Sequence, residues 1–187
     1  RRDRLTFAMI VGIPIIQLVL FGYAINTDPK RLPTAVIVAD NGPVGRTIVT
    51  AMQPTPTTQY AVTELTEHVE KATGVRLAVV TEAAIPETLH TRVFIGDTET
   101  GRRLGIEPDQ LPRETYLIRS VGNDLFIAGR DAGGDPMSDS NPDSGTLFGV
   151  YELLERFVGV RWLWPGELGT YVPGTETIAF SAVNETK

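Results

Sequence analysis

Two tryptophans and two neighbouring charged residues near the C-terminal end are the strongest candidates for binding chemistry in this sequence. Trp162 and Trp164 alternate along a predicted strand, so we expect both indole rings to point to one face. Tryptophans on one face of a strand can stack against sugar rings, and they can equally pack a helix onto a sheet. Arg161 and Glu167 are their nearest polar partners. These four residues are carbohydrate-facing candidates, with packing of the tryptophans as the alternative.

Glu167 by itself does not predict catalysis. Glycoside hydrolysis generally needs two carboxyl groups, held about 5 to 9.5 Å apart across the scissile bond. No motif ties a second acid to Glu167. We therefore assign no catalytic residue.

Four aspartates recur at every fourth position of a polar loop, at Asp131, Asp135, Asp139 and Asp143. Oxygen-rich loops can hold calcium, but this spacing differs from that of an EF-hand loop. The pattern favours a solvated polar insertion over a cation site.

The histidines and a glycine-rich run indicate neither a metal nor a phosphate site. His68 follows Glu64 by one helical turn, and His90 stands alone near a predicted loop; neither has a second ligand at metal spacing. The run Gly129–Gly134 lacks the lysine and the following serine or threonine of a phosphate-binding loop, so turns explain it. We predict no metal and no cofactor.

Composition and charge exclude several classes of protein. The 187 residues carry a net charge of -6 and contain no cysteine, which excludes disulfide scaffolds, cysteine-bound metals and thiol nucleophiles. The basic flank of Arg1, Arg2 and Arg4 against Asp3 gives +2 to residues 1–25, which leaves -8 on residues 26–187. An acidic bulk of this kind argues against a nucleic-acid partner.

An uncharged segment near the N-terminus predicts a membrane anchor. Leu5–Ile25 is 21 residues long, and as a helix it would span about 31 Å, close to the thickness of a bilayer core. The preceding arginines place the N-terminus in the cytoplasm and the bulk of the chain outside, in the periplasm or at the cell surface. A cleaved export signal, ending near Gly22-Tyr23-Ala24, is the competing interpretation.

The remaining pattern predicts an α/β (α+β) fold, in which a mixed β-sheet is covered by helices. Apolar and β-branched runs predict strands at Ala35–Ala39, Val75–Thr81, Arg92–Ile95, Thr115–Val121, Leu125–Ala128, Val160–Trp164 and Thr177–Phe180. Helical spacing and stop signals predict helices at Val44–Met52, Thr58–Thr73, Glu99–Leu104 and Thr146–Val158. We expect Gly122-Asn123-Asp124 to turn a hairpin, Gly74 and Gly159 to end helices, and Ser144 to cap the last one.

Three ordered blocks carry a resemblance to a known accessory domain. They are QYAVTELTEHVEKATGVRLAVV (59–80), VFIGDTETGRRLGI (93–106), and TYLIRSVGNDLFIAGRD with GTLFGVYELLERFVGVRWLWPGELGTYVP (115–173). Together they resemble the N-terminal domain that precedes the catalytic barrel in α-glucuronidases and in β-hexosaminidases of glycoside hydrolase family 20. The resemblance implies a domain without a catalytic acid or nucleophile, and a catalytic (β/α) barrel downstream as its partner, with a glycan as a possible ligand.

A second resemblance covers the start of the chain. Residues 2–50, centred on DRLTFAMIVGIPIIQLVLFGYAINTDPKRLPTAVIVADN, look like the first transmembrane segment of a type-2 ABC exporter permease. The expected organisation is a membrane anchor at 1–25, a permease-like linker and βα segment at 26–57, and a glycosidase accessory domain at 58–187. The predicted function is a membrane-anchored, extracytoplasmic, non-catalytic accessory domain of a carbohydrate-processing enzyme. The N-terminal part of an exporter permease is the alternative.

Overall fold

The computed structural model describes residues 35–38, 47–86, 89, 91–138, 143–180 and 182–187. The chain divides into two units, Arg1–Leu32 and Pro33–Lys187, and every element below belongs to the second. The predicted membrane span Leu5–Ile25 therefore lies outside the described residues. Within the described part of the chain, no helix is both long and apolar enough to cross a membrane.

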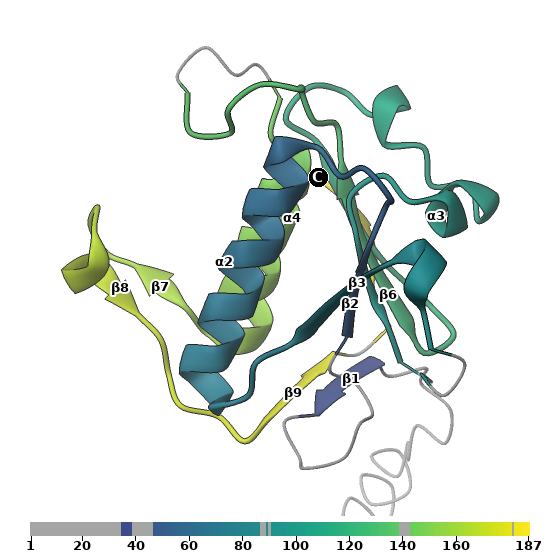
Figure 1. Ribbon diagram of the computed structural model, residues 1–187. Helices are drawn as coiled ribbons and strands as arrows, with labels where there is room; N and C mark the ends of the chain where they lie inside the picture. The colour runs from purple at the N-terminus through teal and green to yellow at the C-terminus, as the bar shows by residue number, and fades with distance from the viewer. Residues whose placement is uncertain (1–34, 39–46, 87–88, 90, 139–142, 181) are drawn as a thin grey trace, which may run out of the picture. The chain divides into compact units, whose positions relative to one another are not determined.

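A mixed sheet of six strands lies at the centre of the second unit (Figure 1). In spatial order its strands are β10 (Asn184–Thr186), β5 (Tyr116–Val121), β6 (Asp124–Gly129), β4 (Val93–Ile95), β2 (Thr47–Thr50) and β3 (Ala78–Thr81). Strands β6, β4, β2 and β3 are parallel, whereas β5 runs antiparallel to both β6 and β10. The predicted hairpin is confirmed as β5 and β6, and the strands predicted around β3 and β4 are confirmed as well.

Strand β2 corrects the prediction of a helix at Val44–Met52. Thr47, Ile48, Val49 and Thr50 are all buried, and β2 pairs with β3 on one side and β4 on the other. The four residues are β-branched, which favours an extended backbone, and a parallel strand covered on both faces needs no polar alternation. A short apolar run of this kind looks the same as a buried helix in sequence. Residues 44–46 lie outside the described residues.

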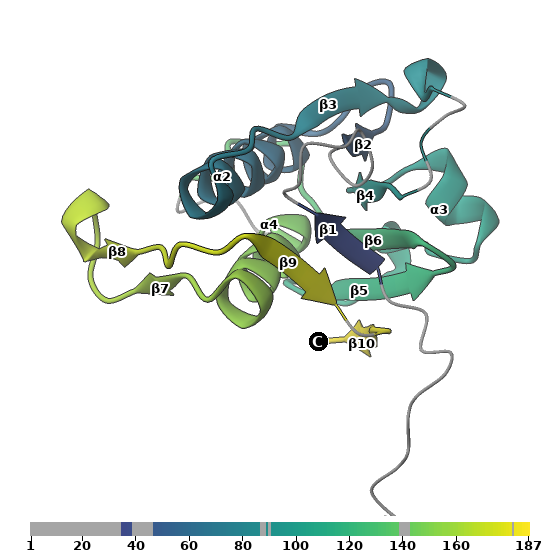
Figure 2. The same cartoon turned by 90° about the horizontal axis from the view of Figure 1, so that it is seen from below.

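Two helices lie side by side over one face of the sheet, and α3 (Glu99–Arg103) lies over the other (Figures 1 and 2). Helix α2 (Pro56–Thr73) confirms the predicted helix; the Thr55 side chain caps its start, and Gly74 ends it with a φ of 73°. Helix α4 (Gly145–Leu153) continues into a π-helical turn, η3 (Leu154–Val158), before Gly159 ends it. The prediction of one regular helix at Thr146–Val158 is therefore correct in extent but not in its last turn.

Alternation along the strands builds a core on each face of the sheet. Ile48, Ile95 and Ile127 face α2 and α4, together with the buried side chains of those helices. Their neighbours Val49 and Phe94 face the other side with Phe126, whose ring stacks on Phe94 at a centroid distance of 4.6 Å. Both faces of the sheet are thus covered by apolar contacts, which holds α2 and α4 in fixed positions.

Asp131 joins the N-termini of α2 and α4. Its carboxylate accepts hydrogen bonds from the Thr146 backbone N–H at 2.9 Å and the Thr58 hydroxyl at 3.2 Å. Ser144 occupies the N-cap position of α4 as predicted, but its side chain makes no capping bond. The carboxylate from the preceding loop takes that role instead, because it reaches an otherwise free N–H of the first turn.

A close backbone contact places α4 on the sheet. A Cβ added to Gly145 would lie 2.3 Å from the Thr115 carbonyl oxygen, and one added to Gly129 would lie 2.2 Å from the Gly145 carbonyl carbon. Gly149, one turn along α4, similarly faces Ile127, whose Cγ2 would be 2.8 Å from an added Cβ. Glycines in the block that begins with GTLFG are therefore required for packing.

An arm, defined here as Arg161–Tyr171, extends from the end of the helical layer (Figures 1 and 2). It contains β7 (Arg161–Trp162), η4 (Glu167–Gly169) and β8 (Thr170–Tyr171), with β7 and β8 antiparallel. The predicted strand Val160–Trp164 is thus shorter than expected. The chain bends because Pro165 and Gly166 follow, and Gly169 lies so close that an added Cβ would be 1.9 Å from the Trp164 carbonyl oxygen.

The last pair of strands lies beside this layer. Strand β1 (Ala35–Val38) pairs antiparallel with β9 (Thr177–Phe180), and both were predicted as strands. Ile178 of β9 is buried in the core under α2 and α4.

Candidate functional site: a groove between helix α2 and the arm

A groove of about 860 Å³ lies between α2, the end of α4 and the arm. Its lining combines aromatic, acidic and basic side chains with a few small residues. It is lined by Tyr60, Glu64, Glu67, His68, Lys71, Met137, Tyr151, Trp162, Gly166, Glu167, Thr170 and Val172. Volumes of this order are typical of small-molecule sites.

A carboxylate flanked by two tyrosines forms one wall of the groove. The Tyr60 and Tyr151 hydroxyls lie close to the Glu64 carboxylate and to each other. Burial, followed by the nearby Glu64 charge, raises the pKa of Tyr60, and burial with the same charge raises the pKa of Tyr151 well above its ordinary value. Both phenols therefore stay protonated at physiological pH.

His68 lies next to this cluster on α2 and is almost fully buried. Its Nδ1 lies 2.8 Å from the Glu64 backbone oxygen and 3.8 Å from Glu64 Oε2. A carbonyl oxygen can only accept, so Nδ1 carries the proton and Nε2 is left as an acceptor in the neutral ring. The imidazole packs against Trp162 at a centroid distance of 5.6 Å, and Tyr151 meets the same indole edge-on at 5.1 Å.

The rim of the groove is charged. Glu67 and Lys71 are exposed on α2, and Glu167 is exposed on the arm. With Glu64, three carboxylates line the groove against one ammonium group. The groove is therefore complementary to a ligand that carries positive charge or many hydrogen-bond donors.

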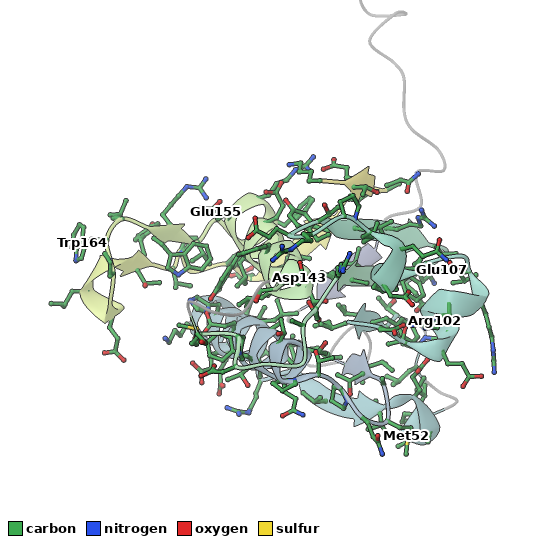
Figure 3. The ribbon with its side chains drawn as sticks, turned by 90° about the horizontal axis from the view of Figure 1, so that it is seen from above. Met52, Arg102, Glu107, Asp143, Glu155 and Trp164 are labelled. Carbon is green, nitrogen blue, oxygen red and sulfur yellow. The ribbon has the colours of Figure 1, made fainter. Side chains whose placement is uncertain are left out.

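The structure brings together two of the four residues that the sequence singled out. Trp162 and Glu167 both line the groove. Arg161 is exposed, and its guanidinium donates to the backbone oxygens of Glu155 at 2.7 Å and Val160 at 2.8 Å. Trp164 lies past the end of β7 and is 56% exposed at the outer end of the arm, as Figure 3 shows. The two indoles thus occupy different environments, one in contact with the helices and one in solvent.

Sequence reasoning did not assign Tyr60, Glu64, His68 or Tyr151 to this site, although all four line the groove. The signal was present, because Tyr60, Glu64 and His68 follow one another at four-residue spacing and so share one face of α2. Tyr151 is separated from them in sequence and reaches them through the packing of α4 on α2.

A second, smaller cavity of about 290 Å³ lies where β2, β4 and β6 end, and several of its charged groups are already paired within the protein. Arg102 pairs with Asp97 at 2.5 Å and lies 3.6 Å from Asp109. Asp131 bonds to the two helix N-termini, and burial raises its pKa despite those bonds. Paired groups have little to offer a ligand, so we favour the groove.

The prediction that the aspartate loop is a solvated insertion is only partly correct. Asp143 is 6% exposed, and its carboxylate lies 3.4 Å from Arg113 and 3.3 Å from Arg130. Asp135 is exposed, whereas Asp139 and His90 lie outside the described residues. Among the residues that the structure describes, no three histidine, aspartate or glutamate side chains are grouped so as to hold a metal ion.

Comparisons with known proteins find similarity in structure alone. No family model matches the chain, and no curated protein matches it in sequence. A family GH115 4-O-methyl-α-glucuronidase, described as specific for decorated arabinogalactans, has a TM-score of 0.53 at 16% identity, covering 78% of this chain and 17% of that enzyme. The described part of the chain shares its fold with a glycoside hydrolase domain.

Weaker matches are of the same kind. A mutant Streptomyces plicatus β-hexosaminidase in complex with GlcNAc gives a TM-score of 0.45 at 16% identity, over 83% of this chain and 23% of that one. The family GH84 structure CpGH84D gives 0.38 at 10% identity, over 84% and 23%. This chain therefore spans less than a quarter of each enzyme. These comparisons give no support to the permease resemblance of residues 2–50.

Proposed function

We propose that this chain is a non-catalytic accessory domain of a carbohydrate-processing enzyme of the α-glucuronidase or β-hexosaminidase type. The observation that carries the proposal is the shared fold with a segment of an α-glucuronidase that makes up 17% of that enzyme. A fold match by itself does not fix a function. The aromatic and acidic groove adds the independent support, because such side chains suit sugar hydroxyls and ring faces.

The arm is the surface through which the domain would contact a following catalytic (β/α) barrel. It exposes Leu163 by 66%, Trp164 by 56% and Leu168 by 92%, and Tyr171 next to them by 58%. Large apolar side chains gathered on a short projection are typical of a docking surface. Burial of Trp164 and Leu168 together against a partner would contribute about 3 to 6 kcal/mol before the cost of association.

A binding experiment with charged substitutions tests this docking. A barrel domain, where the reading frame beyond Lys187 encodes one, is purified and titrated with the chain, its Leu168→Asp variant and its Met52→Asp variant. Met52 is a matched control, since it is 63% exposed and lies at the opposite end of the unit from Trp164 (Figure 3). We expect Leu168→Asp to weaken binding about tenfold or more and Met52→Asp to leave it unchanged. Equal effects of the two variants would argue against docking through the arm.

A free-standing glycoside hydrolase is the second candidate, because Glu64, Glu67 and Glu167 line one groove. The sequence alone had tied no second acid to Glu167. Release of nitrophenol from aryl glycosides distinguishes the two functions. An accessory domain gives no release above buffer, whereas release that Glu167→Gln or Glu64→Gln abolishes would establish hydrolysis by this chain.

The membrane anchor remains part of the proposal. Leu5–Ile25 would hold the chain with its N-terminus in the cytoplasm and the domain outside. Protease added to spheroplasts, from which any outer membrane has been removed, should degrade the domain if this topology is right. Protection of the domain until the membrane is broken would contradict it.

A further inference from the structure

The polar atoms that line the groove are mainly hydrogen-bond acceptors. His68 has 7% of its side chain exposed, and its Nδ1 proton is committed to the Glu64 backbone oxygen. Nε2 has no hydrogen-bond partner within the described part of the chain. Nε2 is not among the fully buried polar atoms that lack a partner in the described residues, and His68 lines the groove, so a ligand or water there can donate to this nitrogen. His68 can thus accept a hydrogen bond from a ligand in the groove.

Glu64 adds a second acceptor one helical turn away. Its side chain is 16% exposed, and the Tyr60 and Tyr151 hydroxyls lie close to the carboxylate. Each carboxylate oxygen can accept more than one hydrogen bond, so the two phenols do not exhaust its capacity. An ionised carboxylate can only accept, so a ligand that binds Glu64 must donate to it.

The aromatic rings and the rim charges narrow the class of ligand. Trp162 and the two tyrosines offer ring faces and edges, which attract cations and the apolar faces of sugar rings. Glu67 and Glu167 add negative charge at the rim, and Lys71 is the one cation among the groove residues that the structure describes. A uronic acid would meet repulsion here, whereas an ammonium group would meet carboxylates and aromatic faces together.

We propose that the groove binds an amino sugar through its protonated amine, with Glu64 and His68 as the acceptors and Trp162 beside the sugar ring. This inference rests on the proposed function in taking a carbohydrate as the ligand. It goes further in naming a cationic sugar, for which an acceptor-lined groove of about 860 Å³ has both the chemistry and the room.

A matched series of oligosaccharides tests the charge of the ligand. The full chain, in detergent, is titrated with the tetramers of glucosamine, N-acetylglucosamine and galacturonic acid, which differ in carrying a cation, no charge or an anion. The chain has two tryptophans, so Trp164→Phe leaves Trp162 as the single indole and its fluorescence reports on the groove. We expect the glucosamine tetramer to bind about tenfold or more tightly than the acetylated one, and the galacturonate to give no change in fluorescence.

Variants then test the residues. Glu64→Gln should weaken binding of the glucosamine tetramer about tenfold, and Glu167→Gln less, because Glu167 is exposed. Glu107→Gln is the control, since Glu107 is an exposed acid on the far side of the unit from the arm (Figure 3). If Glu64→Gln fails to fold, as judged by circular dichroism, the comparison of the three tetramers on the parent chain still tests whether the groove prefers a cationic sugar. Equal affinity for the three tetramers would overturn the proposal.

A simple amine separates this inference from the proposed function. If trilysine binds as tightly as the glucosamine tetramer, the groove recognises amines without regard to the sugar, and the proposal of an amino sugar fails while docking through the arm is untouched. If docking through the arm fails but the glucosamine tetramer binds with the expected selectivity, the accessory role fails and the groove assignment stands.

Discussion

Replacement of Asp131 should loosen the helical layer that carries the groove. Asp131→Ala removes the acceptor for the Thr146 N–H at 2.9 Å and for the Thr58 and Thr55 hydroxyls at 3.2 and 3.4 Å. A hydrogen bond to a charged group contributes about 1.5 to 3 kcal/mol, and the two longer bonds contribute less. Relief of the buried charge offsets part of the loss, so we expect the free energy of unfolding to fall by about 2 kcal/mol.

Asp131→Asn is the informative partner variant. An amide oxygen can still accept from the Thr146 N–H, and the amide group can donate to a threonine hydroxyl, so we expect a loss of about 1 kcal/mol or less. For a unit of this length, 2 kcal/mol corresponds to a fall of about 4 to 8 °C in the melting temperature. Circular dichroism of the full chain in detergent, heated at neutral pH, measures both variants.

The difference in stability between the parent and Asp131→Asn should also depend on pH. Burial raises the pKa of Asp131 above its ordinary value of 3.8, so the folded state holds this proton more tightly than the unfolded state does. Asp131 therefore stabilises the fold most at low pH, and this contribution is lost as the pH rises through its folded pKa. Relative to Asp131→Asn, the parent should lose stability over that range and then level off. Parallel pH profiles of the two chains, or an Asp131→Ala variant as stable as the parent, would refute the reasoning.

Two further predictions concern the packing and the groove. Gly149→Ala should cost about 1 to 3 kcal/mol in thermal unfolding, because its Cβ would lie 2.8 Å from Ile127 Cγ2, whereas Gly134→Ala, with nothing within 4 Å of its Cβ, should change little. In a spectrophotometric titration, Tyr60 and Tyr151 should ionise above the ordinary pKa of 10.0, and Glu64→Gln should lower both values. Folded-state phenols that resist ionisation make stability fall as the pH rises above that value. Normal titration of all tyrosines in the folded chain would contradict the buried cluster.

Local signals predicted most of the elements. Helix α2 was predictable because its apolar positions, its proline-rich start and Gly74 agree with one another. The β5–β6 hairpin was predictable because its strands alternate around a turn that needs Gly122, whose φ is 60°. In each case the decisive interactions lie within a few residues of one another.

The failures depended on tertiary structure. Strand β2 is four buried β-branched residues whose partners β3 and β4 come from further along the chain, so a local pattern could not separate strand from helix. The arm bends where Gly169 meets the backbone of Trp164, a contact that strand periodicity does not encode. The sequence predicted a solvent-exposed carboxylate at Asp131, but this group accepts hydrogen bonds from residues at the N-termini of two helices.

Only some of the groove residues could be predicted from the sequence, because others are brought together by tertiary packing. Trp162 and Glu167 drew attention by their type and spacing, and both line it. Tyr151 reaches Glu64 because α4 packs beside α2 on the sheet, which no local spacing shows. The alternation of Trp162 and Trp164 predicted that both side chains share one face of a strand. Because β7 ends at Trp162, Trp164 lies beyond the strand and is exposed instead.

Sequencing the intact transcript beyond the codon for Lys187 tests the central claim most directly. An accessory domain of a carbohydrate-processing enzyme predicts an uninterrupted reading frame that continues into a (β/α) barrel with two acidic residues at its strand ends. Further membrane-spanning segments in place of a barrel would contradict the account and favour the alternative, the N-terminal part of an exporter permease.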